Sequence, residues 1–373
     1  MLQDSFKPSA KVFIAATGAV TATYVYFLLF AQFGFLKAVL AAGSAVPPLK
    51  VLMTVMGAAG MLASAAVARG FTIERTQRAL RLGFALCAVA AGLSLVPAST
   101  LTFVAVAGLV GAGLGLTTVA LVCVLRRALG GARLGTVIGL GTGLAYGFCN
   151  LPTVFTGSAP VQAGIALAAA LGGLVAALKL ELKTSPNTPT GYDYTPAGMA
   201  VWVLVFLVLV GLDSAAFYVI QHTPTLTQSG WSRDSGLWVN AGVHFVAALL
   251  TGYALDQRWM GRSMLLGAGA LFVACVLLDE GTHAFAQGTL LYTAGVSIYS
   301  TVLVFYPARG MRPWLAAAVY AIAGWFGSGL GIGLAENMQR LPLGVIAFAA
   351  GVVGVAMVIR QRGHEAQLKA FHG

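Results

Sequence analysis

Long apolar runs separated by short polar breaks fill almost the whole 373-residue chain. A helix needs about 20 apolar residues, at about 1.5 Å per residue, to cross a hydrocarbon core about 30 Å thick. Runs that meet or approach this length lie near residues 12–34, 49–68, 82–97, 100–125, 135–156, 160–180, 198–222, 235–256, 263–279, 285–306, 314–335 and 342–360. They are continuous and do not alternate in polarity, which argues against a transmembrane β-barrel. The pattern therefore predicts twelve transmembrane helices.

The composition agrees with this pattern and excludes several classes of protein. Hydrophobic residues make up 58% of the chain and charged residues only 9%, whereas a soluble domain has about 25% charged residues. The four cysteines stand singly in apolar runs, so we expect buried thiols and not disulfides. No Walker motif and no placeable Ser–His–Asp set is present, which argues against an ATPase or a hydrolase. We expect a polytopic membrane protein in the lipid bilayer, with no enzymatic activity and no cofactor.

The positive charges predict the orientation of the chain. When the helices are threaded from a cytoplasmic N-terminus, all 22 Lys and Arg residues fall on the cytoplasmic side except Lys37, Lys50, Arg233 and Arg340. Cytoplasmic loops are enriched in Lys and Arg, so we expect both termini in the cytoplasm and the protein in a bacterial cytoplasmic membrane. The net charge of +11 is spread over the polar breaks. It forms no continuous basic patch, which argues against nucleic acid as a partner.

A polar stretch in the middle of the chain divides the predicted helices into two sets of six. It predicts an N-terminal bundle over 1–181, a cytoplasmic linker over 182–197 and a C-terminal bundle over 198–373. Landmarks recur between the two sets at a constant offset of 182 residues: Gly70 with Gly252, Glu74 with Asp256, Arg127 with Arg309 and Gly147 with Gly329. A fixed offset is the mark of an internal repeat, so we expect the two bundles to superpose.

Two of these landmarks lie in a motif with a family resemblance. Residues 70–78 read Gly-Phe-Thr-Ile-Glu-Arg-Thr-Gln-Arg, which resembles the loop signature of the major facilitator superfamily, Gly-x-x-x-Asp-Arg-x-Gly-Arg. Glu74 replaces the Asp, and Gln77 replaces the second Gly. A second copy over 252–262 keeps the Gly, the Asp and the final Gly-Arg but is two residues longer. The two copies lie in equivalent loops, and the resemblance covers essentially the whole chain.

The resemblance implies a fold and a mechanism. The fold is an all-α membrane protein of twelve helices, in two six-helix bundles related by a parallel repeat. The mechanism is secondary transport by rocker-switch alternating access, with the loop motif pairing charges to clip helices together on the cytoplasmic side. The residues implied in this gating are Gly70, Glu74, Arg75, Arg78, Gly252, Asp256, Arg258, Gly261 and Arg262. The alternative is that these charges only anchor the helices.

One acidic residue and one histidine lie well inside the predicted spans, namely Asp213 on the seventh and His244 on the eighth. A charge at a helix centre costs about 3 kcal/mol on insertion scales, so its presence needs a reason. Each lies nine residues from the outer end of its span, which corresponds to about 13 Å. We therefore expect both near the midplane, as a pair that exchanges a proton or binds a metal ion. Alternatively, Asp213 bonds to Tyr or Ser neighbours and His244 packs in a helix interface.

Other polar side chains recur at one-turn spacing near this pair. The candidates for solute binding or coupling are Asn150, Gln221, Asn240, Tyr24, Tyr292 and Tyr299. The first, fourth, seventh and tenth helices of the superfamily line its central cavity, which the resemblance implies for Tyr24, Asp213, Tyr292 and Tyr299. Tyrosines in spans also serve as interface anchors or packing groups.

These side chains favour a class of solute. The predicted cavity holds one acid, one imidazole and several hydroxyls but no Lys or Arg, which disfavours a phosphate or dianionic substrate. We expect a small cationic, metal-ion or neutral polar solute, with proton coupling through Asp213. The alternative is a non-transporting assembly or accessory subunit built on the same fold.

Overall fold

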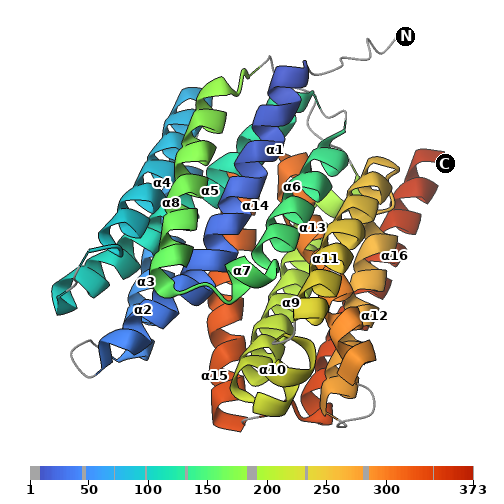
Figure 1. Ribbon diagram of the computed structural model, residues 1–373. Coiled ribbons are helices and arrows are strands. Elements are labelled where there is room, and N and C mark those ends of the chain that lie inside the picture. The colour runs from blue at the N-terminus through green and yellow to red at the C-terminus, as the bar shows by residue number, and fades with distance from the viewer. Residues whose placement is uncertain are drawn as a thin grey trace.

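The computed structural model describes residues 9–43, 48–70, 72–96, 99–130, 133–182, 191–231, 234–279, 285–338 and 340–372. Within these ranges the regular structure is entirely helical, and the helices form one bundle (Figure 1).

The N-terminal half begins with a long helix that contains a π-helical segment. It comprises α1 (Ala10–Val25), the π-helix η1 (Tyr26–Gly34), α2 (Phe35–Ala42), α3 (Leu49–Arg69), α4 (Ile73–Leu93), α5 (Thr100–Leu129), α6 (Leu134–Cys149), α7 (Pro152–Phe155) and α8 (Ala159–Lys179).

The C-terminal half starts with a short 3-10 helix and contains a second π-helix. It comprises η3 (Tyr192–Tyr194), α9 (Pro196–His222), α10 (Pro224–Gly230), α11 (Asp234–Asp256), α12 (Met260–Asp279), α13 (Phe285–Gly310), α14 (Pro313–Ala318), the π-helix η4 (Val319–Gly327), α15 (Ser328–Met338) and α16 (Leu343–His372).

Ten helical segments of the described chain are long and apolar enough to cross a membrane. They match all the predicted spans except 82–97 and 135–156, where the structure places α4 and α6. α4 packs along α5 and α8, and α6 packs along α1 and α11, so both belong to the same bundle. The chain is therefore an integral membrane protein, and its all-helical fold agrees with the sequence prediction.

The start of α4 corrects the predicted boundary of the third span. The helix begins at Ile73, well before residue 82, because the Thr72 side chain accepts a hydrogen bond from the amide of Arg75 and caps it. Glu74, Arg75 and Arg78 consequently lie on the first turns of a helix and not in a loop. These charges also make α4 less apolar than the other long helices.

Most helix packing is local to each half, and a smaller set of contacts joins the halves. The longest contact between the halves runs along α6 and α11; others join α13 to α5 and α6, and α3 to α14 and η4. α1 begins and α16 ends at the same end of the bundle (Figure 1), as an even number of crossings requires. The sequence predicts that this end is cytoplasmic, and it is called the terminal end below.

Candidate functional site

Asp213 of α9 faces two tyrosines of α13. Tyr292 donates a hydrogen bond to one carboxylate oxygen, and Tyr299 donates to the other. The two tyrosines are seven residues apart, which places them on one face of the helix two turns apart. Asp213 keeps some accessible surface, whereas both tyrosines are buried. The structure therefore brings together three of the predicted site residues.

His244 of α11 is also joined to α13. Its Nδ1 lies 2.6 Å from the Ser297 hydroxyl, and its ring packs on Tyr146 of α6 at a centroid distance of 4.8 Å. No hydrogen bond or ion pair joins His244 to Asp213 among the described residues. The predicted contact between Asp213 and His244 is therefore not formed. Each of the two residues instead forms hydrogen bonds with side chains of α13.

Tyr146 links this polar cluster to the N-terminal half. Its hydroxyl donates to Ser300 of α13 at 3.2 Å, and its ring stacks on Tyr24 at 6.4 Å. One turn earlier on α6, the hydroxyls of Thr142 and Thr301 are 3.2 Å apart. We call this the central cluster, made of Tyr24, Tyr146, Asp213, His244, Tyr292, Ser297, Tyr299 and Ser300.

Three further predicted residues lie outside the central cluster. Asn150 donates to the carbonyl of Tyr146 at the end of its own helix, at 2.9 Å. Asn240 donates to the carbonyl of Gly230 at 3.1 Å and so fastens α10 to α11. Gln221 is half-buried near the outer end of α9, and no hydrogen bond joins it to the cluster within the described ranges. Asn150 thus has a local structural partner, whereas Asn240 also accepts a hydrogen bond from the Thr293 hydroxyl of α13 at 3.5 Å.

The sequence predictions missed Ser297 and Ser300. Both lie on α13 between or beside the two predicted tyrosines, and Thr293 and Thr301 extend the same polar stretch. This hydroxyl-rich helix in an apolar chain is the sequence signal that could have identified them. The described residues contain no group of three His, Cys, Asp or Glu side chains that could hold a metal ion. Asp213 and His244, the two metal candidates, bond to different residues.

Aromatic side chains pack together on the side of the central cluster away from the terminal end. Phe33 of η1 packs edge-on against Phe217 of α9 at 5.4 Å and against Phe155 of α7 at 5.3 Å. Phe217 lies one turn beyond Asp213 on the same helix. Further out, the Lys50 ammonium and the Glu336 carboxylate form an ion pair at 2.9 Å between α3 and α15. The two halves therefore touch on this side of the site.

At the terminal end, Asp256 joins the halves through backbone amides. It accepts hydrogen bonds from the amides of Gly135 and Thr136, at 2.7 and 2.8 Å, and from the Thr136 hydroxyl at 2.6 Å. These groups form the first turn of α6, whose free N–H groups and positive dipole end favour a carboxylate. The last residue of α11 thus caps a helix of the other half.

The glycines beside Asp256 let the two backbones approach closely. A Cβ atom on Gly252 would lie 2.4 Å from the carbonyl oxygen of Gly135, and one on Gly135 would lie 2.3 Å from that of Gly252. Real Cβ atoms essentially never come this close, so neither position accepts a side chain without separating α6 from α11. Two of the predicted gating residues, Gly252 and Asp256, therefore lie at a contact between the halves.

The first copy of the motif is placed differently. Glu74 lies 3.8 Å from Arg78 in an exposed pair on α4, Arg75 is exposed on the same helix, and Gly70 ends α3. No bond joins Glu74 to the C-terminal half in the described part of the chain. The two motif copies are thus unequal, because only the second reaches across to the other half.

The remaining residues of the second copy shape the turn between α11 and α12. Arg258 adopts a left-handed conformation with φ 66°. Gly261 packs against the guanidinium of Arg360, and Arg262 lies over the ring of Trp259 at 5.7 Å. The predicted charge clip would pair Asp256 with an arginine of its own motif. Asp256 instead bonds to the backbone of α6.

Comparison with known proteins finds solved structures with a similar arrangement of helices. No protein-family model and no characterised protein sequence matches the chain, but solved structures do. The Escherichia coli fucose:proton symporter FucP superposes with a TM-score of 0.63 at 14% identity, over 93% of this chain and 98% of FucP. The human organic anion transporter MFSD10 superposes with a TM-score of 0.62 at 13% identity, over 95% of this chain and 99% of MFSD10. The chain has the major facilitator superfamily fold.

This fold confirms the resemblance carried by the loop motif. Both matched proteins are described as transporters. At identities of 13% and 14% the likeness concerns the fold, so the solute and the coupling must be argued from the central cluster itself.

Proposed function

We propose that the protein is a secondary active transporter that moves a small solute by rocker-switch alternating access. The moving bodies are two six-helix bundles, residues 1–181 and 198–373, joined by the linker 182–197. Contacts between the halves on both sides of the central cluster support this proposal. Phe33 meets Phe217 on the outer side, and Asp256 caps α6 at the terminal end. Alternating access requires these two contacts to break and form in turn.

The observation that carries the proposal is the hydrogen bonding of Asp213. Both of its oxygens accept from phenol hydroxyls, and no Lys or Arg bonds to it among the described residues. Phenol donors stabilise a carboxylate without neutralising it. The negative charge therefore remains available to a proton or a cationic solute that enters the bundle. We infer proton coupling through Asp213, with His244, Tyr292 and Tyr299 as its neighbours on the solute path.

The side chains of the central cluster also limit the chemical class of the solute. The central cluster offers one carboxylate, one imidazole and several hydroxyl groups. A cation or a neutral polar molecule can bond to these groups, whereas a dianion would need fixed positive charge. We therefore propose a small cationic, metal-ion or neutral polar solute.

A panel of candidate solutes tests this assignment. The unfolding midpoint of the purified protein is measured with metal ions, amines, amino acids and sugars, because a ligand that binds the folded state raises it. The proposal predicts a rise with at least one solute that disappears in Asp213→Asn and persists in Asp234→Asn, a matched change at the start of α11 outside the cluster. Solutes that stabilise both variants equally would favour a non-transporting accessory subunit.

A further inference from the structure

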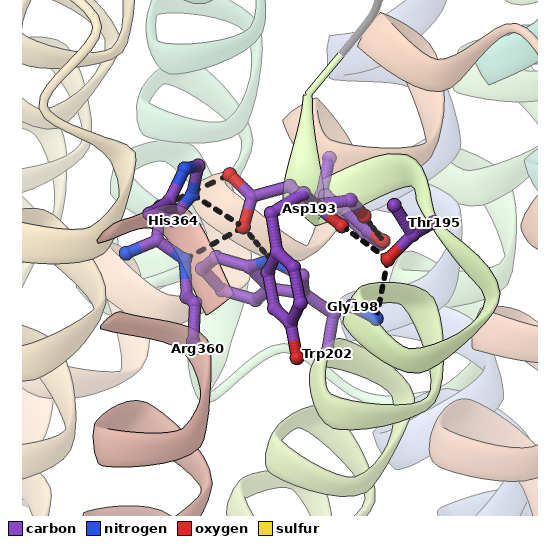
Figure 2. A network of polar contacts seen from close by, with 8 residues as sticks. Asp193, Thr195, Gly198, Trp202, Arg360 and His364 are labelled. Atoms are coloured by element: carbon purple, nitrogen blue, oxygen red, sulfur yellow. Dashed lines mark hydrogen bonds and ion pairs between the residues drawn. The ribbon is translucent and has the colours of Figure 1, made fainter. Parts of the chain in front are cut away.

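The end of the linker is fixed to the C-terminal half by a buried carboxylate (Figure 2). Asp193 of η3 accepts hydrogen bonds from Arg360 of α16, at 2.7 and 3.0 Å, and from the indole of Trp202 at 2.9 Å. His364 Nε2 lies 3.3 Å from the same carboxylate. The Asp193 carbonyl accepts from the Tyr306 hydroxyl at 2.7 Å. Asp193 is therefore fully engaged, and its position fixes the residue that follows it.

That residue, Tyr194, has a buried hydroxyl with no hydrogen-bond partner among the described residues. Its ring stacks on Tyr306 at 5.5 Å, and only 6% of the residue is exposed. Burial raises the pKa of the Tyr194 hydroxyl, although the charge of Arg309 opposes the shift. The hydroxyl therefore stays protonated near neutral pH and can donate a hydrogen bond to an acceptor that the described chain does not provide.

Arginines from both halves surround Tyr194. Arg126 of α5, Arg309 of α13 and Arg312 all lie within electrostatic range of it. Arg126 donates to the carbonyl of Arg309, and Arg312 donates to the carbonyl of Tyr194 at 3.0 Å. The Arg309 guanidinium itself makes no hydrogen bond or ion pair within the described ranges. All three arginines are half-buried and so reachable from solvent.

Among the described residues, two carboxylates at this end of the bundle are bonded to other groups. Asp193 is held by Arg360, and Asp256 is held by the first turn of α6. Like charges placed together at a junction repel each other, and an anion that bonds to several of them removes the repulsion. Guanidinium groups bind phosphate oxygens in pairs of parallel hydrogen bonds, and a phenol hydroxyl supplies one more donor.

We propose that Arg126, Arg309, Arg312 and Tyr194 form a binding site for a phosphate group at the terminal end of the junction between the halves. The phosphate is either a free anion or the headgroup of an anionic phospholipid, since both present the same oxygens. Arg126 belongs to the N-terminal half, Arg309 and Arg312 belong to the C-terminal half, and Tyr194 lies at the end of the linker that is fixed to the C-terminal half. The bound group therefore holds this end of the bundle closed.

Thermal unfolding of the purified full-length protein tests the site in two arms. In neutral detergent, potassium phosphate is compared with potassium chloride at equal ionic strength and pH. In nanodiscs, phosphatidylcholine alone is compared with an equimolar mixture of phosphatidylcholine and phosphatidylglycerol. The variants are Arg309→Gln and Tyr194→Phe, with Arg362→Gln as the control because it removes one exposed positive charge from α16 outside the site.

We expect at least one source of phosphate to raise the unfolding midpoint of the wild type and of Arg362→Gln by about 2 °C or more. Arg309→Gln should lose this rise, and Tyr194→Phe should reduce it. A rise with inorganic phosphate identifies a free-anion site, and a rise confined to phosphatidylglycerol identifies a lipid headgroup site. If Arg309→Gln does not fold, Arg309→Lys replaces it and should retain only part of the rise. Equal behaviour of the site and control variants in both arms overturns the proposal.

Discussion

The carboxylate of Asp213 is held by two neutral donors, which distinguishes it from a structural ion pair. A carboxylate inside the membrane is costly unless it is bonded or neutralised. The phenols of Tyr292 and Tyr299 lower that cost while leaving the negative charge in place. In the transport cycle that we propose, opening the bundle to either side would let the carboxylate exchange a proton or a cation with water. We propose that this exchange ties solute movement to an ion gradient.

The phenol hydroxyls should therefore contribute to stability and to the pH dependence of solute binding, independently of the tyrosine rings. Tyr299→Phe keeps the ring and removes a donor to Asp213, which should cost about 2 kcal/mol in the free energy of unfolding and shift the pH dependence of solute binding. Tyr218→Phe, a matched change near the outer end of α9, should leave both unchanged. The measurements are the unfolding midpoint and solute binding between pH 5 and 8. Identical profiles for the two variants would contradict this role.

For Asp193 we predict a pH-dependent contribution to stability, because its partner Arg360 is charged. Burial alone would raise the pKa of Asp193, but the hydrogen bond and charge of Arg360 outweigh it and lower the pKa below the ordinary value. The unfolded chain therefore takes up a proton at higher pH than the folded one. The stabilisation is fully present above the ordinary pKa of about 3.9 and is lost as the pH falls through the lowered folded value.

Asp193→Asn should therefore be less stable than the wild type near neutral pH, by about 3 kcal/mol. The difference should shrink as the pH falls below about 4, because the wild type loses the same interaction. Unfolding midpoints between pH 7 and 3 measure this, with the exposed Glu365→Gln as the control. A gap between wild type and Asp193→Asn that stays constant down to pH 3 would rule out the ion pair as its source.

The sequence identified individual residues of the site, but it did not predict which residues they contact. Asp213 and His244 are conspicuous because they are the isolated acid and imidazole within the spans. Their equal depth suggested direct contact. The structure instead joins each of them to α13. Which neighbour fills the space between two helices depends on tertiary packing, and helix periodicity alone does not contain that information.

At the scale of helices, the contact between α6 and α11 depends on glycine at specific places. Gly252→Ala places a methyl group against the Gly135 carbonyl, where a Cβ would lie at 2.4 Å, and should cost about 1–3 kcal/mol. Gly242→Ala on the same helix is the matched control, because a Cβ there meets nothing within 4 Å. Unfolding midpoints of the two variants should differ clearly. Equal stability would mean that α6 and α11 do not pack as described.

The spans themselves follow from apolar run length, but their irregularities do not. The runs located the long helices, while α4 begins earlier than its apolar part because Thr72 caps a charged first turn. The break between α6 and α7 near Pro152 and the π-helices η1 and η4 were not predicted. A continuous apolar run has no periodic alternation of polar and apolar residues. It therefore cannot show where the backbone changes from α-helical to π-helical hydrogen bonding. These irregular segments include Phe33, which packs against Phe217, and Tyr320.

For the whole molecule, the two copies of the predicted motif have different structural surroundings. Asp256 caps a helix of the opposite half, whereas Glu74 pairs only with Arg78 on its own exposed helix surface. A half-buried carboxylate that accepts hydrogen bonds from two backbone amides and a hydroxyl contributes more than an exposed ion pair, whose value is about 0–1 kcal/mol. The closure of the terminal end should therefore depend on one copy of the motif and not on both.

Spin labels measure this asymmetry directly. Labels at Lys179 and Gln361, which are exposed on opposite halves at the terminal end, report the separation of the halves, and the four native cysteines are buried. Asp256→Asn should shift the distance distribution toward longer values. Glu74→Gln should leave it as in the wild type. An equal response of the two variants would show that the contact at Asp256 has no special part in closure.

The central claim is that Asp213 couples solute movement to protons. Its most direct test uses proteoliposomes that enclose a pH-sensitive dye, with a solute identified by the binding panel added outside. The account predicts solute-dependent proton flux in the wild type and in Asp234→Asn, and none in Asp213→Asn although that variant folds and reconstitutes normally. Solute-dependent proton flux at the wild-type rate in Asp213→Asn would contradict it.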